Sequence, residues 1–174
     1  GRNIKSVSSD PAGAAAGDIW YNSTSTTLKG VVATSAWASS SLLSQARYGL
    51  AGAGTQTAAL ATAGSSTGSN ALTNNEEYNG SGWSTQTALP VGRIYIGGCG
   101  TQTAALVAGG GAIPTYASIN SYEYDGSSWT AGGNMAQITG TVGQLVGLQT
   151  AGLVIGGDQV PATPRSIANV EEYD

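Results

Sequence analysis

The sequence predicts an all-β fold made of repeated units, and three observations support this prediction. The heptapeptide Gly-Thr-Gln-Thr-Ala-Ala-Leu at residues 54–60 recurs at residues 100–106, and a diverged copy occupies residues 147–153. A tryptophan recurs with a period of 46 residues. Glycine accounts for 27 of the 174 residues, and only 9% of the residues are charged. This composition suits short strands with tight turns, and a fixed period near 46 indicates repeated supersecondary units.

Two segments precede the repeats. Residues 1–16 are rich in glycine, alanine and serine and show no hydrophobic periodicity, so we interpret them as a linker or N-terminal arm. Residues 17–37 contain two short candidate strands, at 17–22 and 28–32. We interpret this second segment as atypical edge or closing strands, because terminal units of repeat proteins differ from interior ones.

Within the predicted repeat region, residues 17–174, three repeats follow, at residues 38–82, 83–128 and 129–174. Each repeat is expected to supply four strands, except that the third ends before its fourth. The expected strands lie at 48–54, 57–64, 75–78, 83–89, 94–100, 103–110, 121–124, from 129 onward, 142–147, 150–157 and 170–173.

The expected turns are of two kinds. Within each repeat, the first two strands are joined through a two-residue turn, which is Thr55-Gln56 in the first repeat. Tight turns at residues 79–82 (Asn-Gly-Ser-Gly) and 125–128 (Asp-Gly-Ser-Ser) follow the third strands. Their Asn-Gly and Asp-Gly dipeptides favour the positive φ angles that two-residue hairpin turns demand.

Four short antiparallel strands in about 46 residues form one blade of a β-propeller, so about three blades are expected per chain. Strands near the axis are crowded and should carry glycine and alanine, whereas outer strands need larger side chains between the sheets. The positions expected to hold this scaffold recur with the period: Trp37, Trp83, Trp129, Tyr78, Tyr124, Tyr173, Glu77, Glu123, Glu172, Gln56, Gln102 and Gln149.

The composition excludes several kinds of function. The net charge is −4 without a basic cluster, which argues against nucleic-acid binding. The absence of histidine rules out histidine-dependent catalytic triads and histidine-ligated metals, and no cofactor is expected. No apolar run reaches the ~20 residues of a membrane span. Nothing resembles a signal peptide, so export by the usual route would need a leader that is missing here.

Several residues have both a structural and a chemical interpretation. Cys99 replaces Ala53 of the preceding repeat and is expected to be a small buried strand residue, with a reactive thiol as the alternative. Arg47 and Arg93 are equivalent by period, which favours a structural use over a catalytic cluster. The loops at residues 65–73, 111–120 and 158–169 differ between repeats and are the expected place for ligand contacts.

The acidic residues recur at the same place in each repeat, which favours a framework role. Hydrolysis of glycosides by a carboxylate pair and an oxygen-ligated metal such as calcium are the alternatives. The recurring tryptophans and tyrosines could stack on sugars, but their strict period favours packing. The acidic residues concerned are Glu76, Glu77, Glu123, Asp125, Glu171 and Glu172.

The repeats resemble the kelch motif. The matching residues are a double glycine, Gly109-Gly110 and Gly156-Gly157, then Glu-x-Tyr followed by Asp-Gly or Asn-Gly, then a tryptophan. The first repeat departs from the motif with Ala63-Gly64. The heptapeptide and the Tyr-Asp-Gly-Ser-Ser-Trp turn at residues 124–129 resemble kelch-like repeats in tail and fibre proteins of tailed bacteriophages, particularly marine ones.

This resemblance implies a non-enzymatic structural protein of the virion, in the tail, a tail fibre or a surface decoration. The implied partners are further copies of the chain, other virion proteins and a host-surface glycan or protein. A secreted carbohydrate- or protein-binding propeller, or a subunit of a polymeric extracellular assembly, is the alternative. An enzyme such as a glycosidase ranks third.

The last blade is incomplete, because the chain stops at Asp174 before a fourth strand, while Trp37 is left over at the other end. Three blades are too few for a ring, since propellers have about four to eight. Two chains that exchange terminal strands to build a six-bladed ring would resolve this. A longer native chain is the rival explanation.

Overall fold

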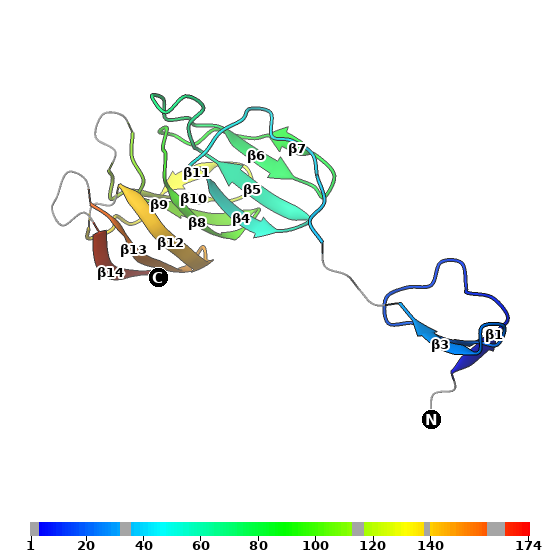
Figure 1. The fold of residues 1–174 in the computed structure, drawn as a ribbon. Coiled ribbons are helices and arrows are strands. Elements are labelled where there is room, and N and C mark those ends of the chain that lie inside the picture. The colour runs from blue at the N-terminus through cyan, green and yellow to red at the C-terminus, as the bar shows by residue number, and fades with distance from the viewer. Residues whose placement is uncertain (1–3, 32–35, 113–116, 138–139, 160–165) are drawn as a thin grey trace. The chain divides into compact units, whose positions relative to one another are not determined.

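The computed structural model describes residues 4–31, 36–112, 117–137, 140–159 and 166–174, and these contain 14 strands in four sheets and no helix (Figure 1). The protein is therefore all-β, as the sequence predicts. The chain divides into two compact units, Gly1–Ser39 and Ser40–Asp174. Within the described ranges there is no helix with the length and apolar character needed to cross a membrane.

The first unit is a small three-stranded sheet. Its strands are β1 (Lys5–Val7), β2 (Ile19–Asn22) and β3 (Thr27–Gly30). Within residues 1–16, interpreted as a linker or N-terminal arm, the structure contains β1, which pairs in parallel with β2. The second candidate strand of this segment begins one residue earlier than expected, at Thr27, and pairs antiparallel with β2.

A carboxylate in the loop after β1 explains why this segment folds back. Asp10 accepts hydrogen bonds from the Trp20 indole at 3.1 Å, the Asn22 amide at 2.7 Å and the Lys29 ammonium at 2.7 Å. These bonds lower the pKa of Asp10 to about 2, with the bond from Lys29 as the largest cause. The glycine- and serine-rich composition of the segment does not predict these three hydrogen bonds to Asp10.

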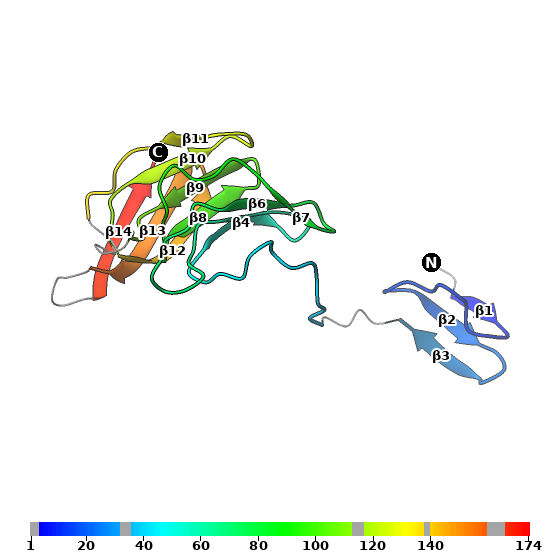
Figure 2. The same cartoon turned by 90° about the horizontal axis from the view of Figure 1, so that it is seen from above.

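The second unit contains three sheets (Figure 2). The first sheet consists of β4 (Ala51–Thr55), β5 (Ala58–Thr62), β6 (Asn75–Tyr78) and β7 (Trp83–Thr85). The second sheet consists of β8 (Gly97–Thr101), β9 (Ala104–Ala108), β10 (Ser121–Tyr124) and β11 (Trp129–Ala131). The third sheet consists of β12 (Thr141–Leu148), β13 (Ala151–Asp158) and β14 (Ser166–Tyr173). All neighbouring strands within these sheets are antiparallel.

The sequence predicts β6 and β10 to the residue, whereas the inner hairpins are shifted. Thr55 pairs with Ala58, so the two-residue turn is Gln56-Thr57 and not Thr55-Gln56. The leading glycine of the heptapeptide causes this geometry. Gly54 has a φ of 99°, and a Cβ there would lie 2.2 Å from the Ala58 carbonyl oxygen. Gly100 and Gly147 repeat this close approach.

The outer turns have four residues. Tyr78 pairs with Trp83, and the Asn79 side-chain oxygen accepts the N–H groups of Ser81 at 3.0 Å and Gly82 at 2.9 Å. Within residues 79–82 only Gly80 has a positive φ, of 90°. The turn therefore spans residues 79–82 as the sequence predicts, but the expectation of positive φ angles at both Asn79 and Gly80 is wrong. The asparagine closes the turn through its side chain instead.

The left-handed region of φ recurs near the end of each second strand or directly after it. The double glycines of the second and third repeats provide it, with φ of 66° at Gly109 and 62° at Gly156. Ala63 adopts the same conformation with a φ of 65°, although it carries a Cβ. Its methyl group is fully buried in the core, which offsets part of the conformational cost.

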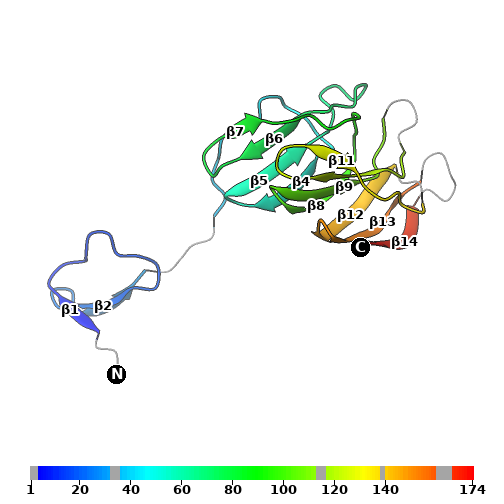
Figure 3. The same ribbon diagram turned by 180° about the vertical axis from the view of Figure 1, so that it is seen from behind.

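The three sheets pack face to face in chain order, with β4 next to β8 and β8 next to β12 (Figure 3). Small residues are required along these first strands. A Cβ on Gly98 would lie 2.9 Å from the Ala51 Cβ, and a Cβ on Gly97 would lie 2.6 Å from the Val142 Cγ1. These close approaches between the first strands explain why they carry glycine and alanine.

Candidate functional site: the contacts between sheets

The recurring residues meet at two interfaces in the second unit. The first interface lies between the first and second sheets and the second interface lies between the second and third sheets. Buried residues of the first interface are Ala51, Leu60, Ala63, Leu89, Ile96, Ala105, Val107, Tyr124 and Trp129. Buried residues of the second interface are Cys99, Leu106, Ala108, Val142, Leu145 and Val154.

The glutamine of the heptapeptide crosses each interface. Gln102 Nε2 donates to the carbonyl oxygens of Ala59 at 3.1 Å and Tyr78 at 2.7 Å, both in the preceding sheet. Gln149 Nε2 makes the equivalent bonds at the second interface, to Ala105 at 3.2 Å and Tyr124 at 2.7 Å. Each glutamine thus satisfies backbone carbonyls of two strands of its neighbour. The equivalent Gln56 is exposed.

A tyrosine and a glutamate form the second recurring contact. The Tyr124 hydroxyl donates to the Glu77 carboxylate at 3.1 Å, and the Tyr173 hydroxyl donates to Glu123. Tyr124 is fully buried, and burial followed by the Glu77 contact raises its pKa to about 12. The pKa of Tyr173 is also raised, with the bond to Glu123 as the main cause.

The recurring tryptophans pack on the tyrosines of their own sheets. The ring centroids of Tyr78 and Trp83 lie 5.1 Å apart, and those of Tyr124 and Trp129 lie 4.8 Å apart. Trp37 departs from this pattern, because it belongs to no strand and its side chain is fully exposed. Two of the three periodic tryptophans therefore occupy equivalent places in the structure.

Another set of glutamates holds the segment that leads into its own sheet. Glu76 accepts the Ser44 N–H at 2.9 Å and forms a buried ion pair with Arg47 at 2.5 Å. Burial opposes ionisation of Glu76, but the bonds from Ser44 and Arg47 outweigh it and hold its pKa below its ordinary value. Glu171 accepts the N–H groups of Ala136 at 2.6 Å and Gln137 at 2.9 Å.

The second repeat lacks the backbone N–H donor that Ser44 and Ala136 provide in the first and third repeats. Ser44 and Ala136 are two periods apart, and Pro90 stands midway between them. Proline has no N–H to donate. At the place of the acceptor the second repeat has Tyr122 instead of glutamate. Sequence reasoning missed this contact because its donor is a backbone group, although the paired change at Pro90 and Tyr122 was its one visible signal.

The remaining candidate residues also serve structural contacts. Arg93 is buried and donates to the Asn120 side-chain oxygen at 3.1 Å. Thr139, the position equivalent by period, lies outside the described residues. Cys99 is buried as expected, and burial raises the pKa of its thiol. In the described part of the chain no three His, Cys, Asp or Glu side chains are grouped so as to hold a metal ion.

Asp125 closes the outer turn of the second repeat. Its carboxylate accepts the N–H groups of Ser127 at 2.8 Å and Ser128 at 2.7 Å. These bonds hold the pKa of Asp125 far below its ordinary value. Asp125 is therefore the counterpart of Asn79 in the first repeat.

The loops expected to contact ligands are described only in part. In the loop at residues 65–73 the Asn70 side-chain oxygen accepts bonds from the Ser65 hydroxyl at 2.9 Å and the Ser66 and Thr67 N–H groups at 3.2 Å. This loop is organised by its own side chains. Parts of the other two loops, 113–116 and 160–165, lie outside the described residues.

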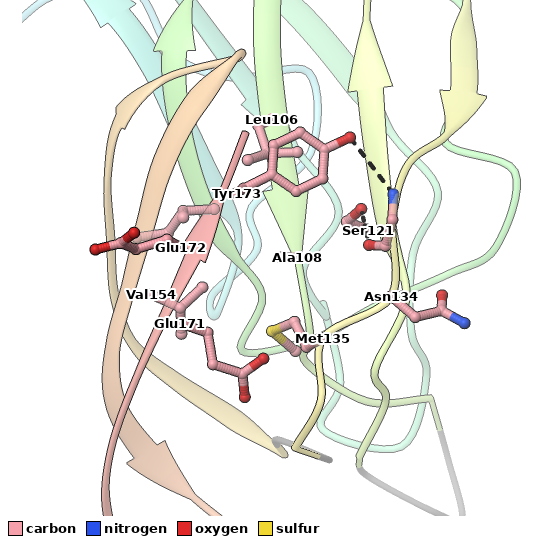
Figure 4. A pocket seen from close by; sticks show the side chains of 11 residues that line it. Leu106, Ala108, Ser121, Asn134, Met135, Val154, Glu171, Glu172 and Tyr173 are labelled. Carbon is pink, nitrogen blue, oxygen red and sulfur yellow. Dashed lines mark hydrogen bonds between the residues drawn. The ribbon is translucent and has the colours of Figure 1, made fainter.

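A small cavity lies within the second interface (Figure 4). Ser121, Met135, Glu171 and Tyr173 contribute to its wall, and its volume is about 50 Å³. A cavity of this size has room for ordered water, since about 10–15 Å³ of such volume holds one water molecule. Known small-molecule sites have volumes of about 300–1,000 Å³, so the cavity is too small for a sugar.

Two larger hollows lie on the outer faces of the sheet stack. One, of about 470 Å³, is on the first sheet and is lined in part by Gln56, Tyr78 and Trp83. The other, of about 280 Å³, is on the third sheet and is lined in part by Gly152 and Glu172. Both hollows are thus lined by recurring residues whose equivalents in the other repeats contact a neighbouring sheet.

Comparison with known proteins gives a fold but no family. No family model matches the chain, and no curated protein is similar to it. A solved structure described as the structure of YjhT superposes with a TM-score of 0.63 at 11% sequence identity. The match covers 87% of this chain and 47% of that chain, so this chain spans about half the length of that protein. At this identity the likeness concerns the fold alone.

Proposed function

We propose that this protein is a non-enzymatic scaffold of the β-propeller type and a structural component of a virion, in the tail, a tail fibre or a surface decoration. The observation that carries the non-enzymatic part is the use of the recurring carboxylates. Glu77 and Glu123 accept tyrosine hydroxyls across the two interfaces, and Glu76 and Glu171 hold the segments leading into their sheets. These groups are engaged in holding the sheets together.

The placement of these carboxylates does not suit hydrolysis of glycosides. That chemistry needs two carboxyl groups on either side of one cleft, about 5–9.5 Å apart. Glu77 and Glu123 instead belong to different interfaces, each facing a tyrosine of the following sheet. The cavity beside Glu171 has room for water only.

The propeller arrangement is supported by three sheets of similar plan that pack in chain order, with their first strands adjacent. The virion role is supported by the resemblance of the heptapeptide and of residues 124–129 to repeats in phage tail proteins. The loops that differ between repeats would then meet a host-surface glycan or protein. We expect the chain at the virion surface, together with further copies and other virion proteins.

The test of the virion role is fractionation of a lysate from the source of this sequence. An antibody against the chain should detect it in the density-gradient band of intact particles. Its presence only among soluble proteins, or in a secreted fraction without particles, would contradict the proposal and favour the secreted binding propeller. A glycan-array screen then separates an adhesin from an inert decoration.

The non-enzymatic assignment has its own test. Glu123→Gln is expected to lower the free energy of unfolding, because the Tyr173 hydroxyl loses a charged acceptor. If the wild-type chain hydrolyses a glycoside and the variant keeps its stability but loses turnover, the scaffold role of Glu123 is wrong.

A further inference from the structure

We infer that the two outer faces of the sheet stack dock onto each other between two copies of this chain, head to tail, through the same contacts that join the sheets within the chain. The donor face is the outer face of the first sheet. The acceptor face is the outer face of the third sheet. This inference rests on the proposed propeller arrangement but not on the proposed role in a virion.

The donor face presents an unused copy of the contacts that the second and third sheets make. Gln56 is equivalent to Gln102 and Gln149, which are half-buried in the interfaces, but Gln56 itself is exposed. Tyr78 is equivalent to Tyr124, and its hydroxyl bonds the exposed Ser40 hydroxyl at 2.6 Å instead of a glutamate of a preceding sheet. The hollow of about 470 Å³ beside these residues is open to a neighbouring sheet.

The acceptor face presents the matching partners. Within the chain, the acceptors of Gln102 are the carbonyl oxygens of Ala59 and Tyr78. Their counterparts on the third sheet are Gly152 and Tyr173, which line the hollow of about 280 Å³. Glu172, the counterpart of Glu77 and Glu123, is exposed where those two are half-buried.

An apolar surface surrounds these acceptors. Ile155 pairs with Val170 across β13 and β14, and their side chains are 42% and 57% exposed. Val146 and Leu148, two positions apart on β12, are 43% and 60% exposed. In the first two sheets the equivalent face is covered by the following sheet, with Leu60 2% and Leu106 1% exposed, whereas their counterpart Leu153 is half-buried. These exposed apolar side chains would become buried when a second copy docks on this face.

The contacts expected across the docked faces follow from the repeat. Gln56 of one copy donates to the Gly152 and Tyr173 carbonyl oxygens of the other copy. The Tyr78 hydroxyl leaves Ser40 and donates to Glu172 of the other copy. Both contacts reproduce bonds that occur twice within the chain.

The same docking adds a strand to the open edge of the third sheet. In the first two sheets the fourth strand begins with a tryptophan paired to the last tyrosine of the third strand, as Tyr78 pairs with Trp83. In the third sheet β14 is an edge strand. Trp37 of the docked copy lies one period before Trp83 and directly precedes the segment that leads into its donor face. We expect Trp37 to pair with Tyr173 of the other copy.

This head-to-tail contact closes at two copies. Heterologous contacts form either closed rings or open filaments. Propellers have about four to eight blades, so two copies with three sheets each give an allowed ring of six, whereas three copies give nine. Closure also removes the exposed edge of β14 from both copies.

The experiment is light scattering coupled to size-exclusion chromatography of the whole 174-residue chain over a range of concentrations. The expected mass is twice the 17.2 kDa of the chain. Trp37→Ala should give a monomer with an unchanged circular dichroism spectrum, because Trp37 is exposed and outside any strand. Gln56→Ala should raise the dimer dissociation constant at least about tenfold through the loss of two hydrogen bonds.

Two matched controls separate docking from folding. Gln102→Ala should lower the free energy of unfolding but leave a dimer, since its bonds lie within the chain. Leu28→Asp changes an exposed apolar residue of the first unit that belongs to neither set of docking residues, and it should leave the dimer unchanged. A monomeric wild-type chain, an open polymer, or a dimer that tolerates both Trp37→Ala and Gln56→Ala would overturn the inference.

Discussion

The first and second interfaces share their polar contacts and differ in their apolar filling. At both, a glutamine reaches two carbonyl oxygens and a tyrosine reaches a glutamate. At the first, Tyr124 is fully buried against Trp129 of its own sheet. At the second, Tyr173 is half-buried, its sheet ends at β14, and a cavity of about 50 Å³ remains. The polar contacts therefore fix how sheets are placed, while the quality of the packing depends on the fourth strand.

The largest expected difference between the interfaces concerns the two tyrosines. Tyr124→Ala should lower the free energy of unfolding by about 3–5 kcal/mol, because it removes a fully buried ring. Tyr173→Ala should cost only roughly 1–2 kcal/mol, since its ring is half-buried. Urea unfolding in the Trp37→Ala background, which keeps assembly out of the measurement, gives both values. Equal costs would show that the fourth strand does not decide the packing.

The glutamines should behave alike at the two interfaces. Gln102→Ala and Gln149→Ala each leave two backbone carbonyls without their side-chain donor. We expect each change to lower the free energy of unfolding by about 1–3 kcal/mol. Urea unfolding of the two variants tests this equality. A clear cost for one variant and none for the other would mean that the shared polar contact is not equivalent.

Alkaline pH should loosen the first interface through Tyr124. Its pKa in the folded protein is raised from 10.0 to about 12, so its contribution to stability is complete below pH 10 and is lost as the pH rises through 12. The unfolding free energy measured by urea should fall across that range. Tyr124→Phe should make the fall shallower, and an unchanged slope would contradict the assigned shift.

The smallest effect tests the cavity at the second interface. A Cβ on Gly133 would meet the Tyr173 ring at 3.5 Å, an ordinary contact distance at the cavity wall. Gly133→Ala should therefore stabilise the protein by up to about 1 kcal/mol. The matched control is Gly132→Ala, whose Cβ would lie 2.5 Å from the Ser121 hydroxyl and should destabilise it. Thermal unfolding distinguishes them, and a destabilised Gly133→Ala would refute the prediction.

The sequence predicts the all-β class, the repeat and the bounds of β6 and β10, because a Glu-Tyr pair followed by Asn-Gly or Asp-Gly marks a strand end and its turn. It misplaces the inner turn by one residue, since the positive φ of Gly54 arises from its approach to the Ala58 carbonyl. The parallel pairing of β1 depends on the side-chain hub at Asp10, for which no periodic signal exists.

The recurring site residues were found by their period, but their partners were not. Gln102 bonds a carbonyl 43 residues earlier in the chain, and only the packing of the sheets reveals this. The period also groups Trp37 with Trp83 and Trp129, whereas the structure leaves Trp37 exposed outside any strand. The virion role and the closed ring remain predictions.

The most direct test of the central claim, that the recurring carboxylates hold the sheets together, is a pair of double-mutant cycles. One combines Glu77→Ala with Tyr124→Phe, and the other combines Glu123→Ala with Tyr173→Phe, each measured by urea unfolding. Both cycles should give a coupling free energy of at least about 1 kcal/mol, as expected for hydrogen bonds to a charged group. Additivity to within about 0.5 kcal/mol in both cycles would contradict the account.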